Sequence, residues 1–446
     1  GRLLELPRKP EPGDGREWMI YIEPARMDAR QRRDLASTIS STLGDVHAAV
    51  EDWPRLRAAM ARDAETLGDA EGAALLRWLD DGMLTQLGHV TLRRDGSQTM
   101  RLGVCRKSAR NLLSDATYQQ AFAWFDEGEN RALLVVKANQ IAKVHRRVPF
   151  DIFIVPVLED GKVVALSIHA GVWTSAALAT PPDRVPGLRT QLAALLKKHA
   201  LAPNGHDGKA LFHALTTLPH DLLAGFAPRD VERIAMTAMA LTDRPRPQLA
   251  LVQDALQRHL FAFVWLPRDM VSTTVQRQIQ SMLTEASGGE LLDWNLTVDE
   301  GTLAMLRFVV DIRDSDQVPS QAKLEDRLQI MLRGWNEAVE AELAAQGEDA
   351  ARAAALAARF APSFPAAYRP AYRPAEAPRT ARPKQRSISG GCATSRRMSR
   401  QSRAAAMRGS IISPATRRTG CGSKSISCTA GFPCRTPCLR WRISAF

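Results

Sequence analysis

The sequence predicts an α+β fold in which small ferredoxin-like modules of the βαββαβ type are joined by helical segments. Short runs of alternating or continuous apolar residues recur between longer segments with apolar residues at helical spacing. Between 247 and 312 the expected order is strand, strand, helix, strand, strand, with a further helix from 319, which resembles a split βαβ unit. The block from 131 to 200 has a similar pattern, so the two blocks are interpreted as distant copies of one module.

The first half of the chain shows both periodicities. Leu35, Ile39 and Leu43 lie on one face of a long helical stretch, and Asp95-Gly96 is typical of a hairpin turn. The elements expected here are a strand at 17–23, helical stretches at 28–66 and 69–81, strands at 87–92, 100–105 and 131–137, and a hairpin of 150–158 and 162–169.

The second half begins with helices and ends with a strand-rich block. Pro228 suits the first turn of a helix, and Gly288-Gly289 is a stop signal. The elements expected here are helices at 185–200, 206–224 and 228–241, strands at 248–253 and 259–265, a helix at 270–286, strands at 291–298 and 302–312, and a helix at 319–345.

These elements predict a division into seven segments. Helical stretches separate the strand-rich blocks, and the composition changes sharply near residue 373. The segments are the end of a truncated first module at 1–23, a helical linker with a small β element at 24–128, a second module at 129–204, a helical connector at 205–244, a third module at 245–315, a helical segment at 316–372 and a disordered basic tail at 373–446.

The net charge of +12 is confined to the tail. After Glu376 there are 15 Lys and Arg and no acidic residue, so the preceding part carries 45 basic against 48 acidic residues. A nearly neutral body gives no electrostatic reason to bind nucleic acid. Apolar runs such as 152–157 are too short to span a bilayer. No nucleic-acid or membrane partner is therefore expected for the body.

Cysteine usage divides the chain in the same way. Cys105 stands alone before residue 392, which favours a reducing cytoplasm. The five tail cysteines lack a CxxC pair or a nearby histidine, so no metal site is predicted. The chain also lacks the GxxxxGK[ST], GxGxxG, HExxH and GxSxG patterns, and its nine histidines show no ligand spacing. The sequence therefore predicts no catalytic residue and no bound cofactor.

The most polar segment follows the strand expected at 131–137. It contains four cations, a histidine and an amide: Lys137, Asn139, Lys143, His145, Arg146 and Arg147. One interpretation is a pocket for a carboxylate or another anion, because arginine binds carboxylates in a bidentate manner. The other is a solvated loop in which Asn139 stabilises a turn. Lys137, Asn139, His145 and Arg146 are kept as candidate ligand or interface residues.

Two further polar clusters flank expected helices. Asp207, within Asn-Gly-His-Asp-Gly-Lys at 204–209, is a candidate contact residue or the N-cap of a helix at 208–217. Arg268, within Pro-Arg-Asp-Met at 267–270, follows a strand and is a candidate interface residue.

Several of these motifs, in this order, resemble the N-terminal region of large bacterial NAD-specific glutamate dehydrogenases. The resemblance covers about 1–372. Its motifs are Glu-Asp-Trp-Pro at 51–54, Arg-Trp-Leu-Asp-Asp-Gly at 77–82, Leu-Leu-Val-Val-Lys-Ala-Asn at 133–139, Val-His-Arg at 144–146, Trp-Thr-Ser-Ala-Ala at 173–177, His-Asp-Gly-Lys-Ala-Leu at 206–211, Phe-Val-Trp-Leu-Pro-Arg-Asp at 263–269, Trp335 and Phe-Pro-Ala-Ala-Tyr-Arg at 364–369.

The resemblance implies ACT-like modules and a regulatory or assembly role. The family deaminates glutamate with NAD as a large homo-oligomer, and its catalytic and NAD-binding domains lie beyond the matched region. The chain alone is thus expected to be inactive and to associate with itself or with the catalytic domains. A free-standing ACT-like protein that binds an amino-acid effector is the alternative.

The sequence departs from the family pattern at three places. Gln-Leu-Gly-His-Val at 86–90 replaces a Phe-Leu-Gly-Tyr pattern, and Ile-His-Ala-Gly-Val at 168–172 replaces a more apolar Phe-Leu-Gly-Leu-Phe type. The third departure is the tail. Back-translation of 432–446 in a shifted frame permits P-L-S-D-A-L-P-A-L-E-N-F-G-F, which resembles the family, so a frame-shift near 376–386 is expected. A genuine basic tail that binds nucleic acid or anionic membrane is the rival interpretation.

Overall fold

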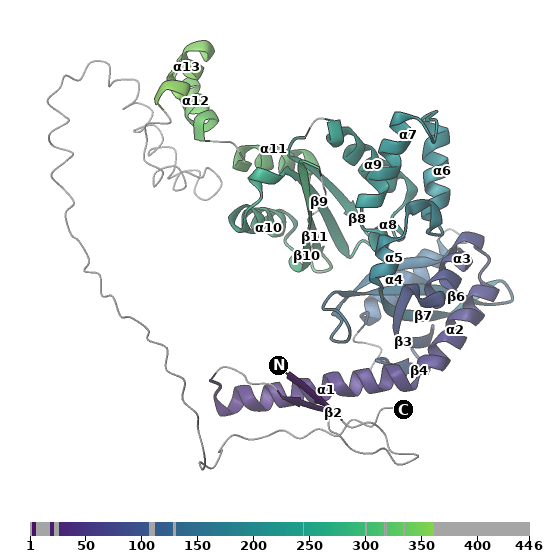
Figure 1. Cartoon of the computed structure of the whole chain (residues 1–446). Helices are drawn as coiled ribbons and strands as arrows, with labels where there is room; N and C mark the ends of the chain where they lie inside the picture. Colours follow the sequence, from purple (N-terminus) through teal and green to yellow (C-terminus); the bar gives the residue numbers. More distant parts are fainter. Residues whose placement is uncertain are drawn as a thin grey trace. The chain divides into compact units, whose positions relative to one another are not determined.

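The computed structural model describes most of the chain up to residue 360 (Figure 1). The described residues are 2–5, 18–21, 26–106, 112–127, 131–243, 245–298, 301–315, 317, 319–332 and 335–360. The expected tail and its frame-shift lie outside them. Contacts divide the described residues into two units, one up to residue 43 and one from residue 44 onward.

The first unit contains a two-stranded antiparallel ribbon. Strand β1 (Arg2–Glu5) pairs with β2 (Trp18–Tyr21), which confirms the strand expected at 17–23. Helix α1 (Ala29–Glu51) follows and continues into the second unit.

The second unit begins with helices α2 (Trp53–Thr66) and α3 (Ala70–Trp78), a short π-helical turn η1 (Leu79–Met83) and an antiparallel sheet. Helix α4 (Asp115–Asp126) lies between the second and third of its strands in sequence. The five strands are β3 (Leu84–Arg93), β4 (Gln98–Gly103), β5 (Leu134–Ile141), β6 (Pro149–Glu159) and β7 (Lys162–Trp173), in the order β4-β3-β7-β6-β5. Asp160 and Gly161 both have positive φ, as the tight β6–β7 turn requires.

This sheet corrects the module predicted at 129–204. The sequence places β3 and β4, as a small β element, in a helical linker at 24–128, yet they share a sheet with β5, β6 and β7. The all-antiparallel five-stranded order is not the βαββαβ arrangement expected for this block. Local apolar alternation identifies a strand, but its partner is chosen by contacts far apart in sequence.

Helices cover both faces of the five-stranded sheet. Successive residues of a strand point to opposite faces. On β6, Ile152 and Ile154 belong to the core that contains Phe122 of α4. Phe153 and Val155 belong to the core that contains Met60 of α2. The sheet is therefore buried on both sides.

A helical segment follows the sheet. Its elements are α5 (Ser175–Ala179), η3 (Pro182–Arg184), α6 (Leu188–Lys198), α7 (His206–Thr217), α8 (His220–Leu223) and α9 (Pro228–Asp243). The helix expected at 206–224 is interrupted between α7 and α8 at Leu218 and Pro219, both in extended backbone. Proline cannot donate the amide hydrogen bond that a continuous helix would need there.

The third module contains a four-stranded antiparallel sheet. Its elements are β8 (Gln248–Gln253), β9 (His259–Pro267), η4 (Arg268–Met270), α10 (Thr273–Ser287), β10 (Glu290–Val298), β11 (Leu303–Asp311) and α11 (Gln321–Leu332). The strand order β10-β11-β9-β8 is that of a split βαβ unit in which the edge strand β8 precedes the unit instead of following α11. The predicted α+β class is confirmed.

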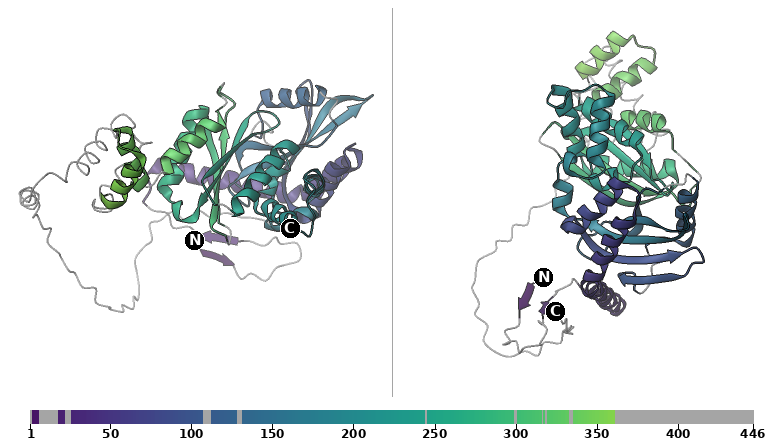
Figure 2. Two further views of the ribbon diagram at one scale, coloured as in Figure 1. Left: turned by 90° about the horizontal axis from the view of Figure 1, so that it is seen from above. Right: turned by 90° about the vertical axis from the view of Figure 1, so that its right-hand side faces the viewer.

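The third module is also packed on both faces (Figure 2). Leu260 and Val264 of β9 join the core of α10 and α11, whereas Phe261 and Phe263 join the core that contains α9.

The helix expected at 319–345 is replaced by α11 and α12 (Trp335–Ala345), and α13 (Ala350–Phe360) follows. Among the described residues, none of the helices has both the length and the apolar character needed to cross a membrane.

Candidate functional site

Lys137, the first of the predicted site residues, is a buried cation at the end of β5. Its side chain is only 7% exposed, and its ammonium donates to Asp151 of β6 and to Asp221 of α8, the latter at 2.5 Å. Burial alone would lower the pKa of Lys137, but the charges of Asp151 and Asp221 outweigh it and raise that pKa. Lys137 therefore remains charged inside the protein.

The third module contributes a second cation to this cluster. Arg307 of β11 lies 3.8 Å from Asp221 and donates to Asp293 of β10 at 2.9 Å. Burial would raise the pKa of Asp221, but Lys137 and Arg307 lower it. Asp221 therefore carries a negative charge between cations from two sheets.

Asn139 and Arg258 link the same two sheets. Arg258, which is 1% exposed and precedes β9, donates to the Lys137 carbonyl at 2.7 Å and to Asn139 Oδ1 at 3.4 Å. The Asn139 amide donates to Asp311 of β11. We call this set the interdomain junction, and its members are Lys137, Asn139, Asp151, Asp221, Asp254, Arg258, Arg307 and Asp311.

The remaining predicted residues lie elsewhere. His145 is exposed, with a φ of 69°, in the β5–β6 connection. Arg146 donates to the Trp173 carbonyl. Asp207 is exposed in the first turn of α7 and is not its N-cap, because the helix begins earlier and Gly205 occupies that position. Arg268 is exposed and donates to the Gly301 carbonyl at 3.2 Å. The structure thus brings Lys137 and Asn139 into one cluster.

A cavity of about 720 Å³ lies beside the interdomain junction. Its lining comes from the start of β5, the turn between α8 and α9, and the turn between β8 and β9. Arg229 and Asp230, which lie 3.7 Å apart as an ion pair, both line it. Asp254 lines it as well and accepts from Arg258 at 3.3 Å, so it belongs to both the cavity and the junction. Its volume falls within the range of small-molecule sites.

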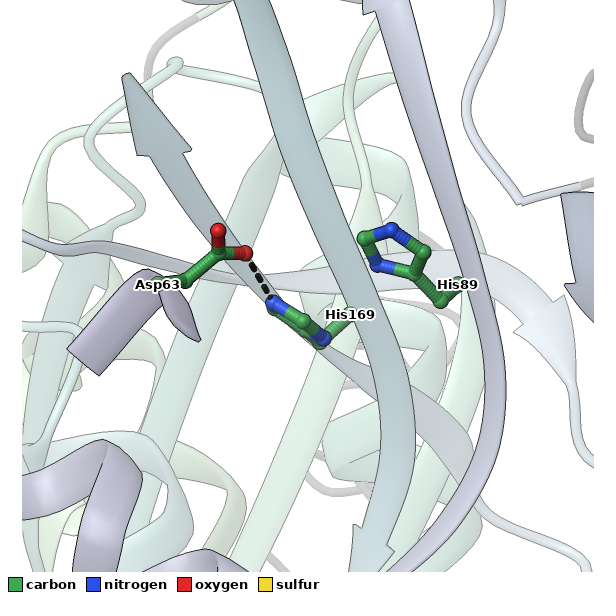
Figure 3. A group of neighbouring side chains, drawn as sticks. All are labelled: Asp63, His89 and His169. Atoms are coloured by element: carbon green, nitrogen blue, oxygen red, sulfur yellow. Dashed lines mark hydrogen bonds and ion pairs between the residues drawn. The ribbon is translucent and has the colours of Figure 1, made fainter. Parts of the chain in front are cut away.

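A second polar cluster consists of Asp63, His89 and His169 (Figure 3). Asp63 comes from α2, whereas His89 of β3 and His169 of β7 lie directly opposite each other in the sheet. His169 Nε2 lies 2.6 Å from Asp63 Oδ2, and the two imidazole rings are 4.6 Å apart with their planes inclined by 32°. One donor atom from each residue lies within 4.8 Å of the other two.

Burial shapes the electrostatics of this cluster. The two histidines are 1% and 2% exposed. Burial lowers the pKa of His89 to about 3, and the neighbouring His169 contributes in the same direction. Burial would raise the pKa of Asp63, but its hydrogen bond with His169 outweighs this effect and lowers it. Ser167 donates a further hydrogen bond to Asp63.

No spacing pattern marks this cluster in the sequence, because its members come from three separate elements. Pairing of β3 with β7 brings His89 and His169 together, and this pairing is not visible in a local pattern. One signal was present: each histidine occurs in one of the two short segments, 86–90 and 168–172, that depart from the family pattern.

Comparisons with known proteins match two parts of the chain to domain families. Residues 248–336 match the glutamate dehydrogenase ACT2 domain, and residues 185–244 match glutamate dehydrogenase helical motif 1. The ACT2 match covers β8 to α11, whose sheet has the strand order of a permuted split βαβ unit.

Curated relatives match a larger share of the chain. NAD-specific glutamate dehydrogenases of Halomonas elongata, Pseudomonas aeruginosa and Mycobacterium tuberculosis are 26%, 25% and 25% identical over 379, 361 and 337 residues. The alignments cover 77%, 76% and 70% of this chain but only 23%, 22% and 20% of those relatives. The chain thus spans about a fifth to a quarter of the length of the curated relatives that it matches.

A solved structure, the blue-light activated histidine kinase of Erythrobacter litoralis EL346, matches 50% of this chain and 95% of that chain at 13% identity. Its TM-score of 0.15 is too low to support any structural argument. The two domain matches and the three relatives agree with the motifs found along residues 1–372. The chain is similar to NAD-specific glutamate dehydrogenases, and two of its segments match their ACT2 domain and helical motif 1.

Proposed function

We propose that this chain is the regulatory and assembly part of an NAD-dependent glutamate dehydrogenase. The full-length enzyme would convert L-glutamate, NAD and water to 2-oxoglutarate, ammonia and NADH. The chain would contribute no catalytic group and would act through its contacts with the catalytic domains or with further copies of itself.

The interdomain junction is the observation that carries this proposal. Lys137 and Arg258 are buried, and the side chain of Asp221 is only 13% exposed. Their contacts connect the five-stranded sheet with α8 and the ACT2 domain instead of lining an open substrate site. Separating such oppositely charged groups is strongly destabilising, because each would remain buried without its partner. Such a connection between the five-stranded sheet and the ACT2 domain fits a regulatory role, because a change in one domain would be passed to the other. It also fits an assembly role, because the two domains would bind their partners as one unit.

Enzyme assays of the purified chain test the proposal. Glutamate-dependent formation of NADH is expected to be absent, and calorimetry with NAD is expected to show no binding. Sedimentation analysis is expected to show self-association, or complex formation when the separately expressed catalytic region is added. Measurable NADH formation by the chain alone would refute its regulatory assignment.

Amino-acid binding is the second candidate function, favoured by the cavity of about 720 Å³. Arg229 and Asp230 could pair with the carboxylate and the ammonium of a free amino acid. Calorimetry with a panel of amino acids distinguishes the two candidates. Binding that is lost in Arg229→Ala supports an effector site, whereas silence across the panel removes this candidate.

A further inference from the structure

We propose that Asp63, His89 and His169 bind a divalent transition-metal ion, with Zn²⁺ as the best-matched ion. The site lies between α2 and the five-stranded sheet, away from the interdomain junction. It is independent of the proposed regulatory function, because it concerns how this domain is held together.

The donor set fits zinc. Two imidazole nitrogens and one carboxylate oxygen form a common zinc ligand set, and a water molecule completes the tetrahedron. All three donor atoms already lie within 4.8 Å of one another (Figure 3). An ion at bonding distance from each would require small side-chain movements.

An unpartnered nitrogen points to a ligand at this place. His89 is 1% exposed, and its Nδ1 has no hydrogen-bond partner although it is buried. Buried polar atoms normally have a partner, so an orphaned imidazole nitrogen needs an explanation. Figure 3 shows the ring of His89 beside that of His169, which itself faces Asp63. A cation among the three would give His89 Nδ1 its missing partner.

A purely structural Asp–His pair explains only part of the cluster. The hydrogen bond between Asp63 and His169 satisfies those two residues without a metal. It leaves Nδ1 of the buried His89 without a partner, although an apolar or aromatic residue would pack there at lower cost. The metal site explains all three residues together.

Metal binding would change the bonding of this cluster in a defined way. Each histidine would bind the ion as a neutral imidazole, with the lone pair on the coordinating nitrogen (Nε2 of His169, Nδ1 of His89) and the proton on the other ring nitrogen. Asp63 would exchange its hydrogen bond with His169 for a bond to the ion. The Ser167 hydroxyl already donates to Asp63 and would orient the carboxylate as an outer-shell partner.

Metal analysis of the purified full chain tests the proposal. The chain is stripped with a chelator, dialysed against Zn²⁺ or Co²⁺, and analysed by mass spectrometry for bound metal. We expect about one metal ion per chain, a rise in the thermal midpoint with Zn²⁺, and visible d–d absorption of tetrahedral Co²⁺. No retained metal and no Co²⁺ absorption would overturn the proposal.

Variants identify the ligands. His89→Tyr and His169→Leu install the residues of the family pattern, so the sheet should still fold; far-UV circular dichroism checks this. Loss of an outer-shell partner lowers metal affinity by roughly 10–100-fold, so Ser167→Ala should lower the zinc affinity within that range. Each histidine variant removes a ligand and should lower the zinc affinity further. His206→Ala, at an exposed histidine in the first turn of α7, is the matched control and should bind as the unchanged chain does.

Should either histidine variant fail to fold, Asp63→Asn provides the deciding measurement. Asparagine keeps the size of the side chain and a hydrogen-bonding oxygen, but it removes the charge that the ion requires. A loss of zinc binding in a folded Asp63→Asn chain supports the site. Equal metal uptake by Asp63→Asn, His89→Tyr and the unchanged chain would show that the metal binds elsewhere.

Discussion

Lys137 illustrates how a single buried charge is held in this protein. Its ammonium contacts Asp151 and Asp221, and its carbonyl accepts from Arg258. Sequence patterns placed Lys137 at the end of a strand and marked it as polar, which left a solvated loop and an anion pocket as open interpretations. The structure shows a third arrangement, because both carboxylates that surround Lys137 come from other elements.

Removing the Lys137 ammonium should be strongly destabilising. Lys137→Met leaves the buried Asp151 without its cation and Asp221 with Arg307 alone, which costs about 3–5 kcal/mol of unfolding free energy. Urea unfolding followed by circular dichroism measures the loss. Lys143→Met, at an exposed lysine of the same segment, is the control and should change the unfolding free energy by less than about 0.5 kcal/mol. Equal effects of the two substitutions would contradict the buried-charge argument.

At the scale of elements, polar side chains connect helices that are distant in sequence. Glu71, in the first turn of α3, accepts from the backbone of Gly187 and from Arg189 of α6, each at 2.7 Å. Arg189 is the main cause that lowers the pKa of Glu71 to about 2, and the Gly187 amide adds to it. The periodicity predicted both helices, but it could not show that α3 and the start of α6 are neighbours.

This contact predicts a defined dependence of stability on pH. A carboxylate with a lowered folded-state pKa stabilises the fold above its unfolded value of 4.5, and that contribution is lost as the pH falls towards about 2. Solvent screens this pair, so the contribution is about 1 kcal/mol. Glu71→Gln should lower stability at neutral pH and converge with the unchanged chain near pH 2, measured by urea unfolding.

A double-mutant cycle checks that Arg189 is the partner. Arg189→Met should remove most of the same contribution, and the combined variant should lose little more than either single one. Fully additive losses would show that Glu71 and Arg189 act independently.

At the scale of the whole second unit, the interdomain junction connects two sheets whose strands are far apart in sequence. Arg258 precedes β9 of the ACT2 domain, yet it contacts Lys137 and Asn139 of β5. The ACT2 domain and the five-stranded sheet also share one apolar core, which includes Phe153 and Phe263. Regulation through this unit would therefore require the two sheets to respond together.

Arg258→Met should loosen this connection without abolishing either sheet. The Lys137 carbonyl and the Asn139 side chain lose a donor, so β5 should open more often. Amide hydrogen exchange of 134–141 is expected to speed up about tenfold, as a loss of about 1.4 kcal/mol of local stability implies. Arg268→Met, at an exposed arginine that donates to Gly301, is the control. Unchanged exchange at 134–141 would show that Arg258 does not couple the sheets.

The sequence by itself determined the α+β class, most helices and strands, the similarity to NAD-specific glutamate dehydrogenases and the ACT-like nature of the block from β8 to α11. These properties depend on periodicity, turn residues and short motifs, all of which are local. It did not reveal that β3 and β4 join β5, β6 and β7 in one sheet, or that β8 takes the edge of a permuted unit. It also could not show that Lys137 meets Asp221, or that Asp63, His89 and His169 converge. Only the tertiary structure decided these points, because strand partners and buried charge clusters depend on contacts between residues far apart in the chain.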